Sequence, residues 1–209
     1  MDSAPAYRAA DIRAAERPLL DAGVPLMARA AAGLATELRR LAGPLLVLAG
    51  SGNNGGDALF AAASLVAEGR TTRIVVLGDR VHTAGLDAAL AAGATRHDPV
   101  EALGLAHGAV VVDGILGTGS AGCPALRGSA RDVVEALRPL APTVVAVDLP
   151  SGVDPDTGDV PDPAVLRAAV TVTFGALKPG LLREPGAGYA GRVVLVDIGL
   201  DLSRFTPAS

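Results

Sequence analysis

The stretch LVLAGSGNNGGDA (residues 46–58) decides the fold of this chain. Its apolar first half indicates a buried strand, which ends in a cluster of Gly and Asn residues. An acidic residue, Asp57, follows at once, and apolar residues with helical spacing continue over 57–69. A strand, a glycine-rich turn and a helix in this order are typical of the first unit of a doubly wound α/β sheet.

The rest of the chain alternates apolar strands with helical segments. Strands are predicted at 43–50, 71–78, 94–97, 108–117, 142–152, 168–175 and 191–199, with helices at 83–92, 99–106 and 129–140. Strands that are apolar throughout indicate a parallel sheet covered on both faces. We therefore expect an α/β fold: a Rossmann-like, three-layer α/β/α domain with a doubly wound, mostly parallel sheet.

Two Ala-, Leu- and Arg-rich segments with helical spacing, 5–17 and 23–41, precede the first strand, and Pro18 and Pro25 punctuate them. They predict a helical extension before the core. The expected organisation is a single domain over 1–209, made of a helical extension (1–42), an α/β core (43–200) and a tail (201–209).

Composition narrows the class of protein. The formal net charge is −4, so no electrostatic footprint for nucleic acid or an anionic membrane is present. The single cysteine, Cys123, permits no internal disulfide and suits a reducing compartment. The N-terminus lacks the pattern of a signal peptide, and no apolar run has the roughly 18 residues of a membrane span. We expect a soluble cytoplasmic protein.

Three polar clusters follow predicted strands. They are GSGNNGGD (50–57), the segment after Asp113 and the segment after Asp148. Since parallel strands end at one edge of the sheet, where doubly wound folds bind ligands, these clusters should converge. Each aspartate alone could be an ordinary turn or helix-capping residue, and glycines alone could merely permit a turn.

Familiar nucleotide motifs fit only in part. No lysine follows the glycines, as a Walker loop requires. GSGNNG (50–55) does satisfy the dinucleotide pattern, and Asp79 closes the second predicted strand. A Rossmann oxidoreductase is therefore an alternative, although no acid/base set for hydride transfer stands out.

The chemistry of these clusters suits a hard cation. Asn, Asp and Ser oxygens at strand ends are ligands for such ions, and a mostly neutral set favours K⁺ over Mg²⁺. Histidine and cysteine ligands for zinc are lacking.

Four motifs together, AGSGNNGGDALFAA, VVDGILGTG, VVAVDLPSGVDPDTG and TVTFGALKPGLL, resemble the NAD(P)H-hydrate epimerases, the YjeF N-terminal domain family. The similarity covers nearly the whole chain in the family's order. It implies epimerisation of the damaged cofactors NADHX and NADPHX at C6 of the hydrated nicotinamide ring, with K⁺ bound. It also implies a homodimer and coupling to an ADP- or ATP-dependent dehydratase. A non-catalytic nucleotide-binding or scaffold module is a further alternative, since fold does not fix function.

The resemblance also implies a site, residue by residue. The K⁺ ligands would be Asn54, Asp113 and Ser151. The residues that contact the substrate would be Asn53, Asn54, Gly55, Gly56, Asp57, Gly117, Thr118, Gly119, Ser120, Ala121, Gly122, Cys123 and Asp148.

Asp148 is the expected acid/base, because proton transfer needs a positioned titratable group. Relatives often carry a basic residue near Ala121 or Gly122, which this chain lacks; phosphate neutralisation would then come from helix N-termini or Arg127. Lys178 is the sole lysine beside 17 arginines, which favours a required contact for its ammonium group.

Overall fold

The computed structural model describes residues 4–208. Within this range, seven strands form one sheet in which every neighbouring pair is parallel. The strand order is β3-β2-β1-β4-β5-β6-β7. The strands are β1 (Leu45–Ala49), β2 (Thr72–Val76), β3 (Thr95–His97), β4 (Val110–Gly114), β5 (Thr143–Val147), β6 (Val170–Phe174) and β7 (Arg192–Val196).

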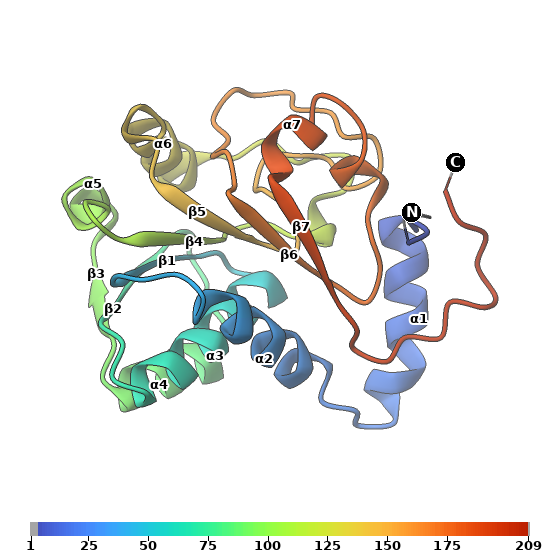
Figure 1. Cartoon of the computed structure of the whole chain (residues 1–209), viewed down its shortest axis with the longest axis horizontal. Helices are drawn as coiled ribbons and strands as arrows, with labels where there is room; N and C mark the ends of the chain where they lie inside the picture. Colours follow the sequence, from blue (N-terminus) through green and yellow to red (C-terminus); the bar gives the residue numbers. More distant parts are fainter. Residues whose placement is uncertain (1–3, 209) are drawn as a thin grey trace.

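Helices occupy most of the connections between these strands (Figure 1). The α-helices are α1 (Ala9–Asp21), α2 (Leu26–Leu38), α3 (Asn53–Ala67), α4 (Thr83–Ala92), α5 (Ala102–Leu105), α6 (Gly128–Leu137) and α7 (Ala187–Ala190). Short 3₁₀ turns are η1 (Pro99–Glu101), η2 (Thr118–Ser120), η3 (Arg138–Leu140) and η4 (Pro179–Leu181). No helix of the described range is both long and apolar enough to cross a lipid bilayer.

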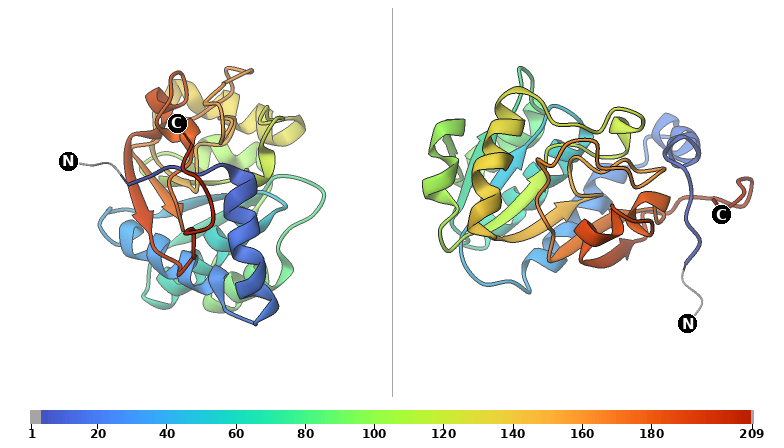
Figure 2. Two further views of the ribbon diagram at one scale, coloured as in Figure 1. Left: turned by 90° about the vertical axis from the view of Figure 1, so that its right-hand side faces the viewer. Right: turned by 90° about the horizontal axis from the view of Figure 1, so that it is seen from above.

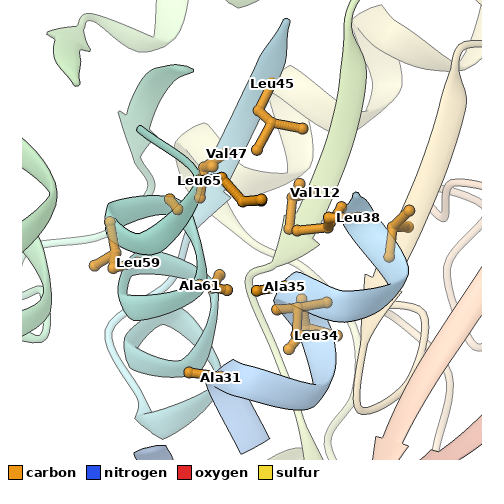
Figure 3. Close-up of a cluster of buried hydrophobic side chains, with 14 of the residues drawn as sticks. Ala31, Leu34, Ala35, Leu38, Leu45, Val47, Leu59, Ala61, Leu65 and Val112 are labelled. Atoms are coloured by element: carbon orange, nitrogen blue, oxygen red, sulfur yellow. The ribbon is translucent and has the colours of Figure 1, made fainter. Parts of the chain in front are cut away.

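The sheet is covered on both faces, as its apolar strands predict. Helices α2, α3 and α4 pack on one face, where Val47 and Val112 meet Leu34 and Leu65 (Figure 3). On the other face, alternate residues of the same strands, such as Leu46, pack with α6. The predicted three-layer, doubly wound fold is confirmed, and the sheet is entirely parallel.

Helix α1 does not belong to either layer. It lies across the carboxyl ends of the strands (Figures 1 and 2). Three hydrogen bonds fasten this region to the sheet edge: Tyr7 N donates to Leu177 O (2.9 Å), Ala9 N to Asp156 Oδ1 (2.7 Å) and Arg13 Nη1 to Thr118 O (2.9 Å). The N-terminal region therefore forms a wall over the edge where ligands bind.

The strands predicted at 108–117 and 142–152 end earlier at this edge, at Gly114 and Val147. Two predicted helix boundaries near this edge are also wrong. Helix α3 begins at Asn53 instead of residue 57, because its glycines let the first turn pack closely against the preceding loop. A Cβ on Gly55 would lie 2.2 Å from the carbonyl oxygen of Gly50. Helix α1 also continues through Pro18 to Asp21. Pro18 removes one helical hydrogen bond there, but Ala14, whose carbonyl loses its partner, is exposed to water.

The strand order reverses beside β1. From β1 the chain moves outward through β2 to β3, then crosses back to β4 on the other side of β1. Loops from β1 and β4 therefore diverge and leave a crevice at their carboxyl ends, the usual ligand position in doubly wound sheets.

Candidate active site

A cavity of about 450 Å³ opens at this switch point. Its walls come from the loop and first turn of α3, the loop after β4, the ends of β5 and β6, and helix α1. Its lining residues are Ile12, Arg13, Glu16, Ser51, Gly52, Asn53, Asn54, Asp57, Ile115, Leu116, Gly117, Thr118, Gly119, Ser120, Cys123, Asp148, Phe174 and Lys178.

Asp148 and Lys178 form a buried ion pair in the cavity. Lys178 is only 1% exposed, and its Nζ donates to Asp148 Oδ1, to Thr173 Oγ1 (2.8 Å) and to Phe174 O (3.0 Å). All three ammonium protons therefore have an acceptor. A lysine this deeply buried needs such partners, since an unpaired charge would be costly.

The backbone at Asp148 is also unusual. Its φ is +68°, a left-handed conformation that non-glycine residues seldom adopt. Thr118 N donates to Asp148 Oδ2 (3.1 Å), so the loop after β4 holds the second carboxylate oxygen. Backbone strain of this kind persists where surrounding contacts enforce it and is common at functional sites.

The carboxylate of Asp113, at the end of β4, has neutral partners. It is 1% exposed and accepts from Ser151 Oγ (2.6 Å), Ser151 N (2.9 Å) and Ile115 N (3.4 Å). Burial raises the pKa of Asp113, and these hydrogen bonds oppose the rise. Ser151 Oγ in turn accepts from Leu116 N (2.9 Å) and so joins the loop after β4 to the carboxylate.

Asn54 completes this cluster. Its Nδ2 donates to Leu116 O (2.8 Å), whereas its Oδ1 is buried without a hydrogen-bond partner among the described residues. Buried polar oxygens are almost always satisfied, so an orphaned one linked through Leu116 to the Asp113–Ser151 pair indicates a missing donor or cation. The three predicted K⁺ ligands, Asn54, Asp113 and Ser151, thus meet around Leu116, and their hard oxygens fit such an ion.

Two further acids face the same cavity. Asp57 is 8% exposed, and its pKa is raised to about 8 by burial and then by the negative charges of Asp148 and Glu16, with Lys178 opposing. Glu16, from α1, has a raised pKa for the same reasons, burial first and then Asp148. The sequence offers no signal for Glu16, because its helix reaches the site only in the tertiary fold.

Asp154 fixes the loop 117–123 from behind. Its Oδ2 accepts from Gly122 N (2.6 Å), and its Oδ1 accepts from Asp156 N (2.9 Å) and Thr157 N (3.0 Å). Within the loop, Ser120 Oγ donates to Gly117 O (2.8 Å). The segment 154–157 therefore anchors this loop through Asp154, and it also binds the start of α1 through Asp156.

Most of the residues predicted to contact substrate do line the cavity. The exceptions are Gly55, Gly56, Ala121 and Gly122. Gly55 and Gly56 are buried behind the first turn of α3, where they permit close packing. Asp79, which a Rossmann oxidoreductase would use, is exposed and outside the lining. Arg127 is likewise outside it, whereas Arg13 lies in the wall.

The fold and this site define a class: a doubly wound α/β protein with an acid- and lysine-containing ligand cavity at the switch point. The family model "YjeF-related protein N-terminus" matches residues 24–180. The chain belongs to this family, which confirms the resemblance found in its motifs.

Two relatives and one solved structure extend this match. An NAD(P)H-hydrate epimerase of Clavibacter sepedonicus is 57% identical over 97% of this chain and 94% of its own length. The bifunctional NAD(P)H-hydrate repair enzyme Nnr of Mycobacterium tuberculosis is 44% identical over 95% of this chain, which spans only 42% of that enzyme. The crystal structure of the yeast protein YNL200c shares the fold, with a TM-score of 0.75 and 21% identity over 91% of this chain and 86% of that one.

Proposed function

We propose that this protein is an isomerase that interconverts the R and S forms of NADHX and NADPHX, and so takes part in repair of these cofactors. The observation that carries the proposal is the buried Asp148–Lys178 pair inside a switch-point cavity, in a chain 57% identical to an NAD(P)H-hydrate epimerase. Within the described residues no side chain caps the start of α3, so its first backbone N–H groups would be available to the dinucleotide phosphates.

Asp148 is the proposed acid/base. It lies in the cavity, its two oxygens are oriented by Lys178 and Thr118, and proton transfer needs a group held in this way. Residues of the loop 117–123 and of the α3 start, including Asn53, would contact the hydrate.

K⁺ is the proposed cofactor. Asn54, Asp113 and Ser151 would hold it, with backbone carbonyls completing the shell, and it would supply fixed positive charge beside the substrate. The orphaned Oδ1 of Asn54 supports this assignment.

Substrate conversion tests the function. Purified protein is given NADHX enriched in the R form, and the approach to the R/S equilibrium is followed by chromatography against a protein-free blank, in K⁺ and in choline buffers. We expect a rate well above the blank, faster with K⁺, and a fall of roughly 100-fold or more in Asp148→Asn. A wild-type rate equal to the blank would favour the scaffold alternative, and NAD⁺-dependent hydride transfer would favour the oxidoreductase.

The remaining proposals concern assembly. The bifunctional relative suggests functional coupling to an ADP- or ATP-dependent dehydratase. A homodimer through the N-terminal helices is supported by exposed apolar residues such as Leu20 (51% exposed). Sedimentation of wild type and Leu20→Asp tests the interface. A cytoplasmic location suits a chain with one cysteine.

A further inference from the structure

Asp57 is a buried acid among the expected substrate contacts to which the proposed function gives no chemical role. It is the fifth residue of α3, whose N-cap is Gly52, so its carboxyl lies beyond the positions that cap a helix. Its side chain lines the cavity that also contains Asp148. Within residues 4–208, no group donates a hydrogen bond to its carboxyl. Burying this carboxyl is costly, and no contact in this part of the chain explains it.

The groups around Asp57 are mostly negative. Asp148, after β5, and Glu16, on α1, both raise its pKa, while Lys178 lowers it. The Lys178 ammonium group donates its three hydrogen bonds to Asp148, Thr173 and Phe174 O. Arg13, beside Glu16, donates to Thr118 O. His82, the N-cap of α4, packs near Gly56, the residue before Asp57. With a pKa of about 8, Asp57 keeps its proton at neutral pH.

Epimerisation at C6 requires a protonated acid of this kind. C6 carries a hydroxyl and a bond to the ring nitrogen, so its configuration changes only if one of its bonds breaks. The nitrogen lone pair can form a C=N double bond and expel the oxygen, provided that the oxygen leaves as water. An acid must supply that proton, and a base must accept one when water adds back to the other face.

We propose that Asp57 is the general acid for this step, with Asp148 as the base on the opposite side of the ring. The C6–O bond breaks as Asp57 gives its proton to the hydroxyl. The oxygen departs as one water molecule, and the ring becomes an iminium ion. Water then adds to the other face of C6, the C=N electron pair returns to nitrogen, and Asp148 takes the proton. Solvent returns the proton from Asp148 to Asp57. This assignment rests on the proposed function.

Glu16 has a positioning role in this scheme. Its charge helps to keep Asp57 protonated, although it lies on a helix far away in the sequence. Helix α1 therefore does more than cover the cavity: it sets the pH range in which the acid works.

The first test is the variant Asp57→Asn, which removes the acid and keeps its shape. We expect its epimerisation rate to fall roughly 100-fold or more. Its midpoint temperature of thermal unfolding should be no lower than that of wild type. Asp79→Asn, an exposed acid outside the cavity, is the matched control and should keep the wild-type rate. A rate within a few-fold of wild type in Asp57→Asn would overturn the proposal.

Two further measurements separate an acid from a merely structural residue. The wild-type rate should decline above about pH 8, where Asp57 loses its proton, and Glu16→Gln should move this decline to lower pH. In ¹⁸O-labelled water, catalysed turnover should place solvent oxygen on C6. An unmoved pH profile in Glu16→Gln, or retention of the original oxygen, would contradict the scheme.

Failure of this inference and failure of the function are distinguishable. If the epimerisation rate of the wild-type protein does not exceed that of the protein-free blank, the proposed function is wrong. If wild type is active and Asp148→Asn is not, while Asp57→Asn keeps its rate, only the role of Asp57 is wrong.

Discussion

The ends of β4 and β5 lie side by side, and each carries an aspartate after a run of valines, but the two carboxylates have different partners. Among the described residues, Asp113 receives only neutral donors, two of them from Ser151. Asp148 receives the ammonium group of Lys178 and faces the cavity. The same sequence pattern thus places a proposed cation ligand at one strand end and a proposed acid/base at the other.

Distance along the chain does not decide which groups meet. Ser151 is three residues from Asp148, yet it bonds to Asp113 on the neighbouring strand. Lys178 reaches Asp148 from 30 residues away, because the segment after β6 folds back over the sheet edge. The chemistry of each strand end is therefore set by the element that packs against it.

The largest expected effect comes from removing the charge that distinguishes the two ends. Lys178→Met leaves Asp148 buried without its counter-ion, and breaking a buried pair in this way costs about 3–5 kcal/mol. We expect the midpoint of urea unfolding to fall accordingly, and epimerisation to be lost. Lys178→Arg, which keeps the charge but overfills the site, should cost less, about 1–3 kcal/mol.

The double variant Asp148→Asn, Lys178→Met is the control for this effect. Because neither buried charge remains, much of the lost stability should return, whereas activity should not. If Lys178→Met unfolds at the wild-type urea concentration, the ion pair contributes nothing to the fold and the contrast between the two strand ends is wrong.

A smaller effect is expected at the β4 end. Ser151→Ala removes the hydroxyl that joins Asp113 to Leu116 N, and leaving those buried groups unpaired costs about 1–3 kcal/mol. If Ser151 is also a K⁺ ligand, stabilisation by K⁺ should disappear with it. For wild type we expect about 1 kcal/mol when K⁺ is several-fold above its dissociation constant.

Thermal unfolding in K⁺ and in choline measures this difference. Ser129→Ala, an exposed serine on α6, should behave as wild type, and Asp148→Asn should keep its response to K⁺. An equal response to K⁺ in wild type and Ser151→Ala would place the ion elsewhere or remove it from the proposal.

The sequence predicted the strand ends better than the walls around them. Apolar runs marked every strand except the short, polar β3, and glycine-rich turns marked the edge where Asn54, Asp113 and Ser151 converge. These features are local, since hydrophobic periodicity and turn chemistry depend on near neighbours. The start of α3 was misplaced because Asn and Gly are poor helix formers, and only the close packing of Gly55 against Gly50 explains a helix there.

The remaining wall could not be predicted from local patterns. Helix α1 carries Arg13 and Glu16 into the cavity, but its residues repeat with ordinary helical spacing. Its placement depends on contacts with residues more than 100 positions away, such as the bond from Arg13 to Thr118 O. For the same reason the sequence predicted Arg127, and not Arg13, as the basic residue that neutralises the phosphates.

The smallest expected effect concerns the basic side chain that would contact the substrate's phosphates. At the β5 end, Lys178 is committed to Asp148, so it leaves no free charge for the substrate's phosphates. Arg13 is the other basic residue lining the cavity within residues 4–208, while Arg127 lies outside and donates to Cys123 Sγ (3.1 Å). Arg13→Gln should therefore raise KM roughly fivefold, or about 1 kcal/mol, at unchanged kcat. Arg127→Gln is the matched control, and a larger rise in KM in that variant would return the phosphate contact to Arg127.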